Sequence, residues 1–565
     1  MKTAHTSGPN AASLLWRSLA FVVCVAGTVA SLVLLHDVRG GWAVSAIFGA
    51  LAVRGIADLV QRPRAVLRNY PIIGHLRYLL ESIRPEIRQY LLEADDEKLP
   101  FSRAQRSLVY QRAKSEPSEK AFGTLVDVYR VGHEFVGHSM QPVAAPDPSA
   151  FRVLVGGPDC TQPYSASVFN ISALSFGALS ANAIRALNRG ALDGGFAHDT
   201  GEGSISPHHL ENGGDLVWEI GSGYFGCRNP DGTFSEERFR ETASSPQIKM
   251  IEIKLSQGAK PGHGGILPAH KVSAEIAATR GVPQGEDCIS PARHTAFDSP
   301  RGLLAFVAQL RQLAGGKPVG FKLCVGHPWE FMAIVKAMLE TGITPDFIVV
   351  DGAEGGTGAA PLEFADHVGM PMREGLLFVH NTLVGAGLRE RIRIGTSGKI
   401  VSAFDIACVL ALGADWANSA RGFMFAVGCI QSQSCHTNHC PTGVATQDPL
   451  RQRALVPQDK AVRVRAFHRN TLLALAQMLA AAGLDRPSAL RPQHLQRRVS
   501  AQKVMPFSRL YRFLEPGELL RAGHVAAEPH GSAWALARAD SFLAAPPELP
   551  GAALLEDSRS VAREA

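Results

Sequence analysis

From Phe169 onward, short apolar segments alternate with amphipathic segments at a regular spacing. Each apolar segment runs into a loop rich in Gly or Ser, and a helical pattern follows it. Eight strand–loop–helix repeats predict an α/β protein with a parallel (β/α)8 TIM barrel. A doubly wound open sheet is the alternative, because periodicity alone does not close a barrel. The expected strands are 169–173, 195–199, 216–221, 250–255, 319–325, 347–351, 392–396 and 416–420.

The N-terminal part of the chain has a different pattern, with two long apolar stretches. Residues 18–35 contain no charged side chain, and a second stretch covers 42–60 with Arg54 inside it. The first stretch is close to the length that crosses a bilayer core. Basic residues prefer the cytoplasmic side of a membrane segment, and arginines crowd the far end of the second stretch: Arg54, Arg62, Arg64 and Arg68. We therefore expect a transmembrane hairpin, with the catalytic part facing the cytoplasm.

Two other interpretations of this N-terminal region remain open. A cleaved signal peptide could end near Ala30 and Ser31, although the apolar run is long for that purpose. A single spanning helix followed by an interfacial helix is also compatible with the pattern, because the second stretch is short. Both the hairpin and the single spanning helix would attach the protein to the membrane.

The remaining patterns divide the chain into four parts. We expect a membrane anchor at 1–62 and a mostly helical linking segment at 63–150, in which Ser102 caps a helix. The barrel and its loops are expected at 151–480, and 462–479 reads as an amphipathic helix. A helical extension and an irregular tail rich in Ala and Pro are expected at 481–565.

Composition narrows the functional classes. The chain has 565 residues, of which 46% are hydrophobic and 19% charged, with a net charge of +6. This is a globular composition with some membrane character. The body of the chain has no dense basic tract and no interleaving of aromatic and basic residues, so nucleic acid is not expected as a partner. Nine cysteines, three of them in one motif, fit a reducing compartment better than a disulfide framework.

The three clustered cysteines are Cys429, Cys435 and Cys440, in a short loop that ends in Pro-Thr-Gly. Cysteine thiolates hold iron–sulfur clusters, and a four-iron cubane takes four of them. Three ligands without a fourth nearby therefore suggest a 3Fe-4S cluster. A zinc ion with His436 or His439 as fourth ligand is the rival, although zinc sites favour closer cysteine pairs. Three buried thiols in a reducing compartment are the third interpretation.

The segment Cys429 to Gln447 resembles the cluster-binding segment of the glutamate synthases, whose synthase domain holds FMN and a 3Fe-4S centre. The resemblance extends to Leu174-Ser-Phe-Gly-Ala-Leu-Ser180, Gln257-Gly-Ala-Lys-Pro-Gly-His-Gly-Gly265 and Asp351-Gly-Ala-Glu-Gly-Gly-Thr-Gly-Ala-Ala-Pro361. Together the motifs span roughly residues 165 to 450. Four long motifs in the right order are a specific signal, unlike a single glycine-rich loop.

The barrel and the resemblance together suggest how FMN is held. Barrel enzymes commonly bind phosphate with the loops after the seventh and eighth strands, here Gly398, Lys399, Ala420 and Arg421. Ordinary strand-capping turns are the alternative for these residues. By resemblance, Lys322 is a cation beside the flavin N1–C2 carbonyl, where it stabilises the reduced cofactor; pairing with a structural carboxylate is its alternative. The other expected flavin contacts are Ser175, Gln257, Gly355 and Gly356.

Lys254 and Lys260 flank a glycine-rich loop and resemble family residues at the synthase site. A dianionic keto acid such as 2-oxoglutarate needs cations at both ends, so these lysines are the expected catalytic and substrate-binding residues. Arg293 is a weaker third substrate candidate. Solvated surface charge is the alternative interpretation. His263 stands where the synthases commonly carry a glutamate, which puts the identity or delivery of the nitrogen donor in question.

Two acidic residues in glycine-rich loops, Glu202 and Glu354, fit two roles equally well. They could be acids in the cleft or structural acceptors of backbone N–H groups.

The resemblance implies a stand-alone synthase domain, because no glutaminase cysteine, no second cysteine cluster and no nicotinamide fingerprint is recognisable. The expected reaction is reductive amination of 2-oxoglutarate to L-glutamate via 2-iminoglutarate, with hydride from reduced FMN and electrons relayed by the 3Fe-4S cluster. Electrons would come from an external donor such as ferredoxin or a reductase subunit. Ammonia would be free or supplied by a glutaminase partner. A membrane-anchored FMN and iron–sulfur dehydrogenase for another amino or hydroxy acid is one alternative, and a non-catalytic membrane scaffold is the other.

Overall fold

The computed structural model describes residues 17–94, 97, 100–119, 121–522, 526 and 528–546. The chain divides into two compact units, Met1–Ala94 and Asp95–Ala565. The finer boundaries expected at 62, 150 and 480 are not tested by this division. The last part of the expected irregular tail, 547–565, lies outside the described residues.

Eight parallel strands close into a barrel in the larger unit, in the order β10-β11-β12-β13-β4-β5-β6-β7. The last barrel strand in the sequence, β13, pairs with the first, β4, with Ala417 opposite Phe169, so the sheet has no open edge. All eight expected strands are confirmed, and closure decides against the open sheet. The strands are β4 (Phe169–Ile171), β5 (His198–Asp199), β6 (Leu216–Ile220), β7 (Ile248–Lys254), β10 (Val319–Leu323), β11 (Phe347–Asp351), β12 (Arg393–Ser397) and β13 (Trp416–Ser419).

The barrel interior changes character along its axis. Successive side chains on a strand point to opposite faces, so every second residue faces inward. Near the N-terminal ends, the inward residues are apolar and form one buried cluster that includes Val217, Met250 and Phe347. Two residues further along β6 and β7, the inward residues Glu219 and Glu252 are charged and still buried. An apolar floor therefore lies beneath a polar upper layer.

A β-hairpin that the sequence pattern did not reveal closes the N-terminal end of the barrel. Its strands are β2 (Arg152–Val155) and β3 (Tyr164–Ser167). Val155 and Tyr164 belong to the same buried apolar cluster as the floor of the barrel. The hairpin therefore covers the apolar floor of the barrel at its N-terminal end.

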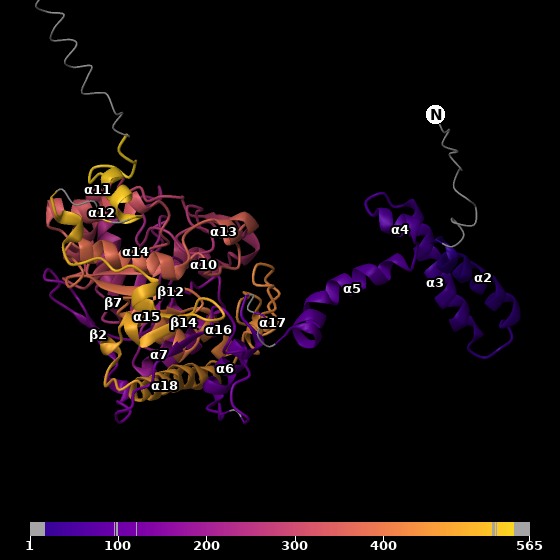
Figure 1. Cartoon of the computed structure of the whole chain (residues 1–565). Coiled ribbons are helices and arrows are strands. Elements are labelled where there is room, and N and C mark those ends of the chain that lie inside the picture. Colours follow the sequence, from indigo (N-terminus) through magenta and orange to yellow (C-terminus); the bar gives the residue numbers. More distant parts are fainter. Residues whose placement is uncertain are drawn as a thin grey trace, which may run out of the picture. The chain divides into compact units, whose positions relative to one another are not determined.

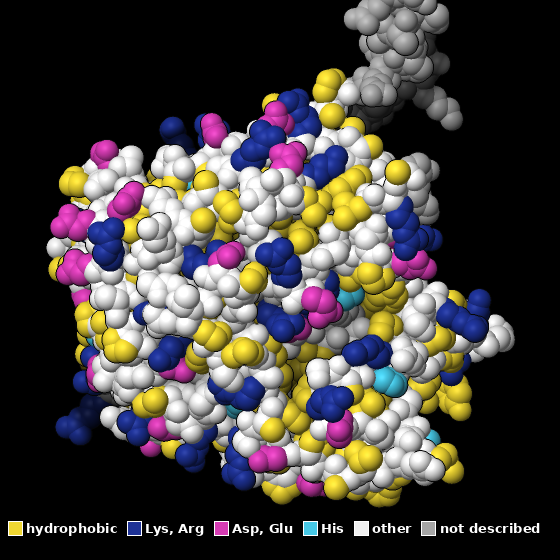
Figure 2. All heavy atoms as spheres, turned by 90° about the vertical axis from the view of Figure 1, so that its left-hand side faces the viewer, with side chains coloured by type: hydrophobic (Ala, Val, Ile, Leu, Met, Phe, Trp, Pro, Cys, Tyr) yellow, Lys and Arg dark blue, Asp and Glu magenta, His cyan; other side chains and the backbone are white. Residues whose placement is uncertain are grey.

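Helices surround the barrel, and two of them fulfil specific expectations. The helix α6 (Arg103–Lys114) begins at Ser102, which forms a reciprocal capping box with Gln105. The helix α18 (Pro457–Ala481) includes the expected amphipathic segment and packs against α6 and α7 (Ala181–Gly194) (Figure 1). On the face shown in Figure 2, acidic and basic side chains are interspersed with apolar ones.

A small antiparallel sheet joins distant parts of the larger unit. It consists of β1 (Glu134–Val136), β14 (Leu495–Arg498) and β15 (Val504–Pro506). Glu134 accepts hydrogen bonds from Arg373 at 2.8 Å and from Arg497 at 2.6 Å. Burial alone would raise the pKa of Glu134, but the two guanidinium groups lower it overall.

The smaller unit contains two apolar helices that lie side by side (Figure 1), α2 (Leu19–Leu34) and α3 (Gly41–Val60). They pack closely, since a Cβ added at Gly27 would lie 2.7 Å from the ring of Phe48. Among the described residues, α3 alone is long and apolar enough to cross a membrane, judged by length and composition. At 1.5 Å per residue, α2 is about 24 Å long, which is short of a bilayer core of about 30 Å. The described residues thus give one helix of spanning length and one shorter apolar helix, and the two-span hairpin stays a prediction.

Candidate active site

A cavity of about 180 Å³ lies at the C-terminal ends of the barrel strands. Its wall is built from the loops after β4, β7, β11 and β13 and from the cysteine loop. In a parallel barrel these loops meet at one end, which is where barrel enzymes bind their ligands. The expected site residues that line the cavity are Ser175, Gln257, Lys260, Gly356, Ala420, Arg421 and Cys435.

Lys254 lies behind this wall and is paired with an acid that lines it. Its Nζ is 2.8 Å from Oε2 of Glu202, and the lysine side chain is 9% exposed. Burial alone would raise the pKa of Glu202, but Lys254, Arg280 and Lys260 lower it overall. Glu202 is thus an acid in the cleft and is held ionised by cations.

A buried histidine fixes the backbone beside Lys254. The Nε2 of His294 is 2.9 Å from the carbonyl oxygen of Lys254, and its Nδ1 is 3.1 Å from the hydroxyl of Tyr224. Burial lowers the pKa of His294 to about 4, so the ring is neutral at physiological pH. A neutral ring that donates to a carbonyl through Nε2 accepts from the tyrosine through Nδ1. The end of β7 is therefore held in place.

Arg280 is a cavity residue that sequence reasoning missed. It ends the short helix α10 (Ala274–Arg280), lines the cavity and is 5% exposed. Its Nη2 donates to the carbonyl of Phe176 at 3.1 Å, and its Nε has no hydrogen-bond partner. The pKa of Lys260, a second cation of the wall, is lowered by burial and by Lys254. Lys271 and Arg421 also line the cavity, so its wall carries four cationic side chains. A guanidinium in a largely apolar segment was the signal available in the sequence.

Three other residues that the sequence analysis singled out also lie apart from the cavity wall. Arg293 is exposed and does not line the cavity, which fits the surface-charge alternative. Glu354 accepts a hydrogen bond from the backbone N–H of Met372 at 2.9 Å and so acts as a structural acceptor. The ring of His263 packs against Phe364, with 5.2 Å between ring centroids.

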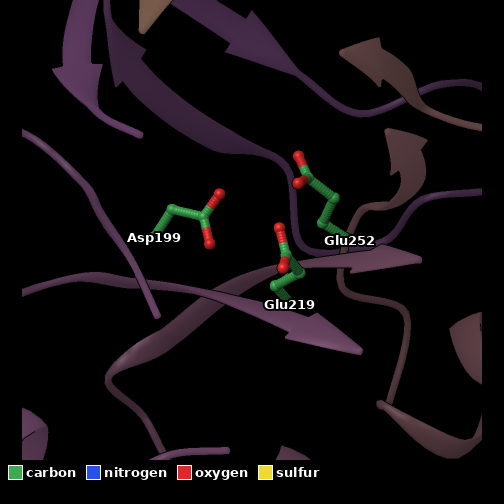
Figure 3. A group of neighbouring side chains, drawn as sticks. All are labelled: Asp199, Glu219 and Glu252. Carbon is green, nitrogen blue, oxygen red and sulfur yellow. The ribbon is translucent and has the colours of Figure 1, made fainter. Parts of the chain in front are cut away.

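Lys322 is buried among carboxylates in the upper layer of the barrel. Its Nζ donates to Glu219 and lies 3.2 Å from Oε1 of Glu252. Figure 3 shows the side chains of Glu219, Glu252 and Asp199 converging from neighbouring strands. This is the pairing that was the alternative to a flavin contact, and the flavin role stays a prediction.

The expected phosphate loops differ in how their helices begin. The helix α15 (Ala403–Ala411) after β12 is capped by its own Ser402 and Asp405. The helix α16 (Arg421–Val427) after β13 has no side-chain cap at Ala420, so its first N–H groups are not bonded to a capping side chain. Such groups bind anions. Ala420 and Arg421 line the cavity, whereas Gly398 and Lys399 lie outside its wall.

The glycine-rich loops have no room for side chains where they meet. A Cβ at Gly258 would lie 1.9 Å from the carbonyl oxygen of Gly352, and one at Gly201 would lie 2.8 Å from the backbone nitrogen of Ser175. A Cβ at Gly356 would lie 3.2 Å from the guanidinium of Arg421. Gly355 belongs to the same contact, within 3.6 Å of Gly258 on this measure. A side chain at these positions would push the loops apart, so glycine is required where they meet.

The thiol spacing does not match a preformed zinc site, and the 3Fe-4S cluster stays a prediction. Tetrahedral zinc binds sulfur at about 2.3 Å, so its sulfur ligands lie about 4 Å from one another. Across the described residues, the group of three side chains with ligand atoms within 4.8 Å is Asp199, Glu219 and Glu252, and the thiols are not so gathered. Iron–sulfur clusters place iron and sulfide between their cysteines and accept a wider spacing.

The surroundings of the thiols also fit a cluster at the edge of the cavity. Cys435 lines the cavity, and a Cβ at Gly358 would lie 3.1 Å from it. Burial raises the pKa of Cys429 to about 11, which by itself disfavours the thiolate form. Burial would also raise the pKa of Cys440, but hydrogen bonds from nearby backbone N–H groups and the Thr442 hydroxyl lower it overall, which favours the thiolate that binds iron.

Comparison with known proteins agrees with the site. A family model described as the conserved region in glutamate synthase matches residues 160–485. The glutamate synthase large subunit-like protein YerD of Bacillus subtilis is 38% identical over 481 residues, which cover 78% of this chain and 91% of that protein. The archaeal glutamate synthase (NADPH) of Methanocaldococcus jannaschii is 36% identical over 57% of this chain and 60% of its own length. The archaeal-type enzyme of Dehalococcoides mccartyi is 33% identical over 58% and 62%. This chain thus spans about three fifths of the two latter relatives, and it belongs to the glutamate synthase family of oxidoreductases.

Proposed function

We propose that this chain is an FMN-dependent glutamate synthase that aminates 2-oxoglutarate reductively to L-glutamate via 2-iminoglutarate. The observation that carries the proposal is the cavity at the C-terminal end of the barrel, which is lined by Lys260 and Arg280 with Lys254 directly behind. A dianionic keto acid is best held by cations at both carboxylates. Relatives named glutamate synthase support the same reaction.

Within this proposal, the chain's own residues bind and orient the substrate. Lys260 and Arg280 are the buried cations that would engage its carboxylates. Lys254 would stay fixed between Glu202 and the carbonyl contact of His294, and so would hold its ammonium at one place at the cavity edge. Precise placement of this kind lowers the entropic cost of the reaction. The glycine-rich loop that contains Gln257 could close over the substrate and exclude water.

The residues around the cavity also indicate where the two cofactors would bind. The residues that would hold FMN are Ser175, Gln257, Gly355, Gly356, Ala420 and Arg421, with Lys322, Gly398 and Lys399 as further predicted contacts. Cys429, Cys435 and Cys440 would hold a 3Fe-4S cluster. FMN supplies hydride transfer and the cluster supplies single-electron transfer when they are bound. An external donor such as ferredoxin or a reductase subunit would provide electrons, and free ammonium or a glutaminase partner would provide nitrogen.

Membrane attachment through residues 1–62, with the catalytic part in the cytoplasm, belongs to the same proposal. Its support is the helix α3, which has 20 residues and is mostly not buried within the protein. The arginines near the C-terminal end of this helix support the orientation. Extraction of cell membranes with alkaline carbonate tests this point. An attached protein stays in the membrane pellet, and a protein released into the supernatant contradicts attachment.

The reaction is tested by anaerobic re-oxidation of the bound flavin. The detergent-solubilised protein is reduced chemically, and flavin absorbance is followed after addition of 2-oxoglutarate, of ammonium, or of both. Re-oxidation with the mixture and not with either compound alone is expected. An intact flavin and cluster that the mixture does not re-oxidise would contradict the proposal and point to the dehydrogenase alternative.

A further inference from the structure

Three carboxylates meet inside the upper layer of the barrel. They are Asp199 on β5, Glu219 on β6 and Glu252 on β7, and one oxygen from each lies within 4.8 Å of the other two (Figure 3). Each of the three residues is at most 3% exposed. The register explains the meeting, because Glu219 lies directly opposite Glu252 in the paired strands. The cluster is therefore built by the barrel and not by a loop.

A single ammonium group, that of Lys322 on β10, contacts this cluster. Asp351 on β11 is a further carboxylate nearby, and it accepts hydrogen bonds from the N–H of Gly258 at 2.8 Å and from the hydroxyl of Ser397. Three buried carboxylates around one ammonium leave an excess of negative charge when all are ionised. Like charges this close in a buried place are not all ionised together.

Two further observations indicate which state the cluster adopts. Among the described residues, Oε1 of Glu252 has an ion-pair contact with Nζ of Lys322 at 3.2 Å but no hydrogen-bond partner of good geometry. A buried acceptor is rarely left unpaired, and a proton shared with a neighbouring carboxylate would satisfy it. Burial and the charge of Glu219 raise the pKa of Asp199 to about 7, and burial also raises the pKa of Glu252.

We propose that Asp199, Glu219 and Glu252 together hold one exchangeable proton and deliver it through Glu219 to a group bound in the cavity. Glu219 is the member of the cluster that lines the cavity. The transfer moves one proton and no electrons, so the cluster becomes more negative by one charge and the acceptor more positive by one. Lys322 stays protonated throughout and offsets that charge, and solvent entering the cavity returns the proton.

The identity of the acceptor rests on the proposed function, whereas the stored proton does not. Conversion of 2-oxoglutarate and ammonium to glutamate and water consumes two electrons and two protons. A donor beside the cavity is therefore useful when the hydroxyl of the carbinolamine leaves as water, a step that general acids promote. The same three oxygens would suit a divalent cation, but the ammonium of Lys322 already pairs with two of the three carboxylates.

The stored proton is tested by infrared spectroscopy of the purified full-length protein. At neutral pH we expect the carbonyl stretch of a protonated carboxyl group. Glu219→Gln keeps a hydrogen-bond acceptor for Lys322 and removes one negative charge, so the band should disappear. Asp415→Asn removes a carboxylate paired with Arg389 at the opposite end of the barrel, and the band should remain. Asp199→Asn repeats the test if Glu219→Gln does not fold.

A kinetic measurement then tests delivery. In a single turnover of the chemically reduced protein, Glu219→Gln should slow product formation about a hundredfold, while FMN binds as in the unaltered protein. Absence of the band in the unaltered protein, or its persistence in both cluster variants, overturns the stored proton. A band that behaves as expected together with unchanged turnover overturns delivery through Glu219. A band as expected in a protein that 2-oxoglutarate and ammonium do not re-oxidise upholds the stored proton and refutes the proposed function instead.

Discussion

Gly258→Ala probes whether the contact between two glycine-rich loops forms the flavin site. The added Cβ would lie 1.9 Å from the carbonyl oxygen of Gly352, and ordinary contact begins at 3.4 Å. The obstructing atom is backbone, so the loops after β7 and β11 must separate by about 1.5 Å, the difference between these distances. Overpacking of this kind costs about 1–3 kcal/mol. If the displaced loops bind FMN, its Kd should rise by about 5- to 150-fold.

The assay is titration of the apoprotein with FMN, followed by flavin fluorescence. Gly326→Ala is the matched control, because a Cβ at that glycine, in the loop after β10, meets nothing within 4 Å. Thermal melting of both variants separates a loss of affinity from a loss of fold. A Gly258→Ala protein that melts like the control and binds FMN equally well would refute the assignment of these loops to the cofactor.

Three further changes test other parts of the account. Lys254→Met removes the ion-pair partner of Glu202, so steady-state kinetics should show KM for 2-oxoglutarate raised about tenfold or more, and Lys254→Arg should be milder. Cys435→Ser should abolish the electron paramagnetic resonance signal of the cluster and leave FMN bound, whereas Cys408→Ser, at a buried thiol in α15, should preserve both. Glu134→Gln should lower the melting temperature at neutral pH more than at pH values below about 4. The reason is that the arginine partners lower the pKa of Glu134 in the folded protein, so its stabilisation exists above the ordinary carboxyl pKa and is lost as the pH falls; an equal loss at both pH values would contradict this.

The barrel could be predicted from the sequence because each strand carries its own signal. Phe347–Asp351, for example, is a continuous apolar run that ends in a glycine-rich loop. A similar pattern of strand, loop and helix occurs eight times. The cap at Ser102 was likewise predictable, because capping depends on residues three apart in the chain. Local sequence patterns were sufficient to predict these elements, and the structure confirms them.

The carboxylate cluster could not be predicted in the same way. Glu219 and Glu252 are each the single acidic residue of their strand, and only the register of β6 against β7 brings them together. Arg280 reaches the cavity because α10 ends there, which no motif indicates. The sheet of β1 with β14 joins Glu134 to a segment near residue 497, and such long-range pairing leaves no local trace. Contacts of this kind depend on how the chain is folded in space.

The central claim is that the cavity joins nitrogen to a keto acid at the expense of a reduced flavin. Its most direct measurement is a single anaerobic turnover with isotope-labelled ammonium and 2-oxoglutarate, in which labelled glutamate is quantified by mass spectrometry against the reduced FMN present at the start. The account predicts one labelled glutamate for each reduced flavin, formed more slowly at subsaturating 2-oxoglutarate when Lys254→Met replaces the unaltered chain. Full flavin re-oxidation without labelled glutamate, or with the corresponding hydroxy acid as product, would contradict it.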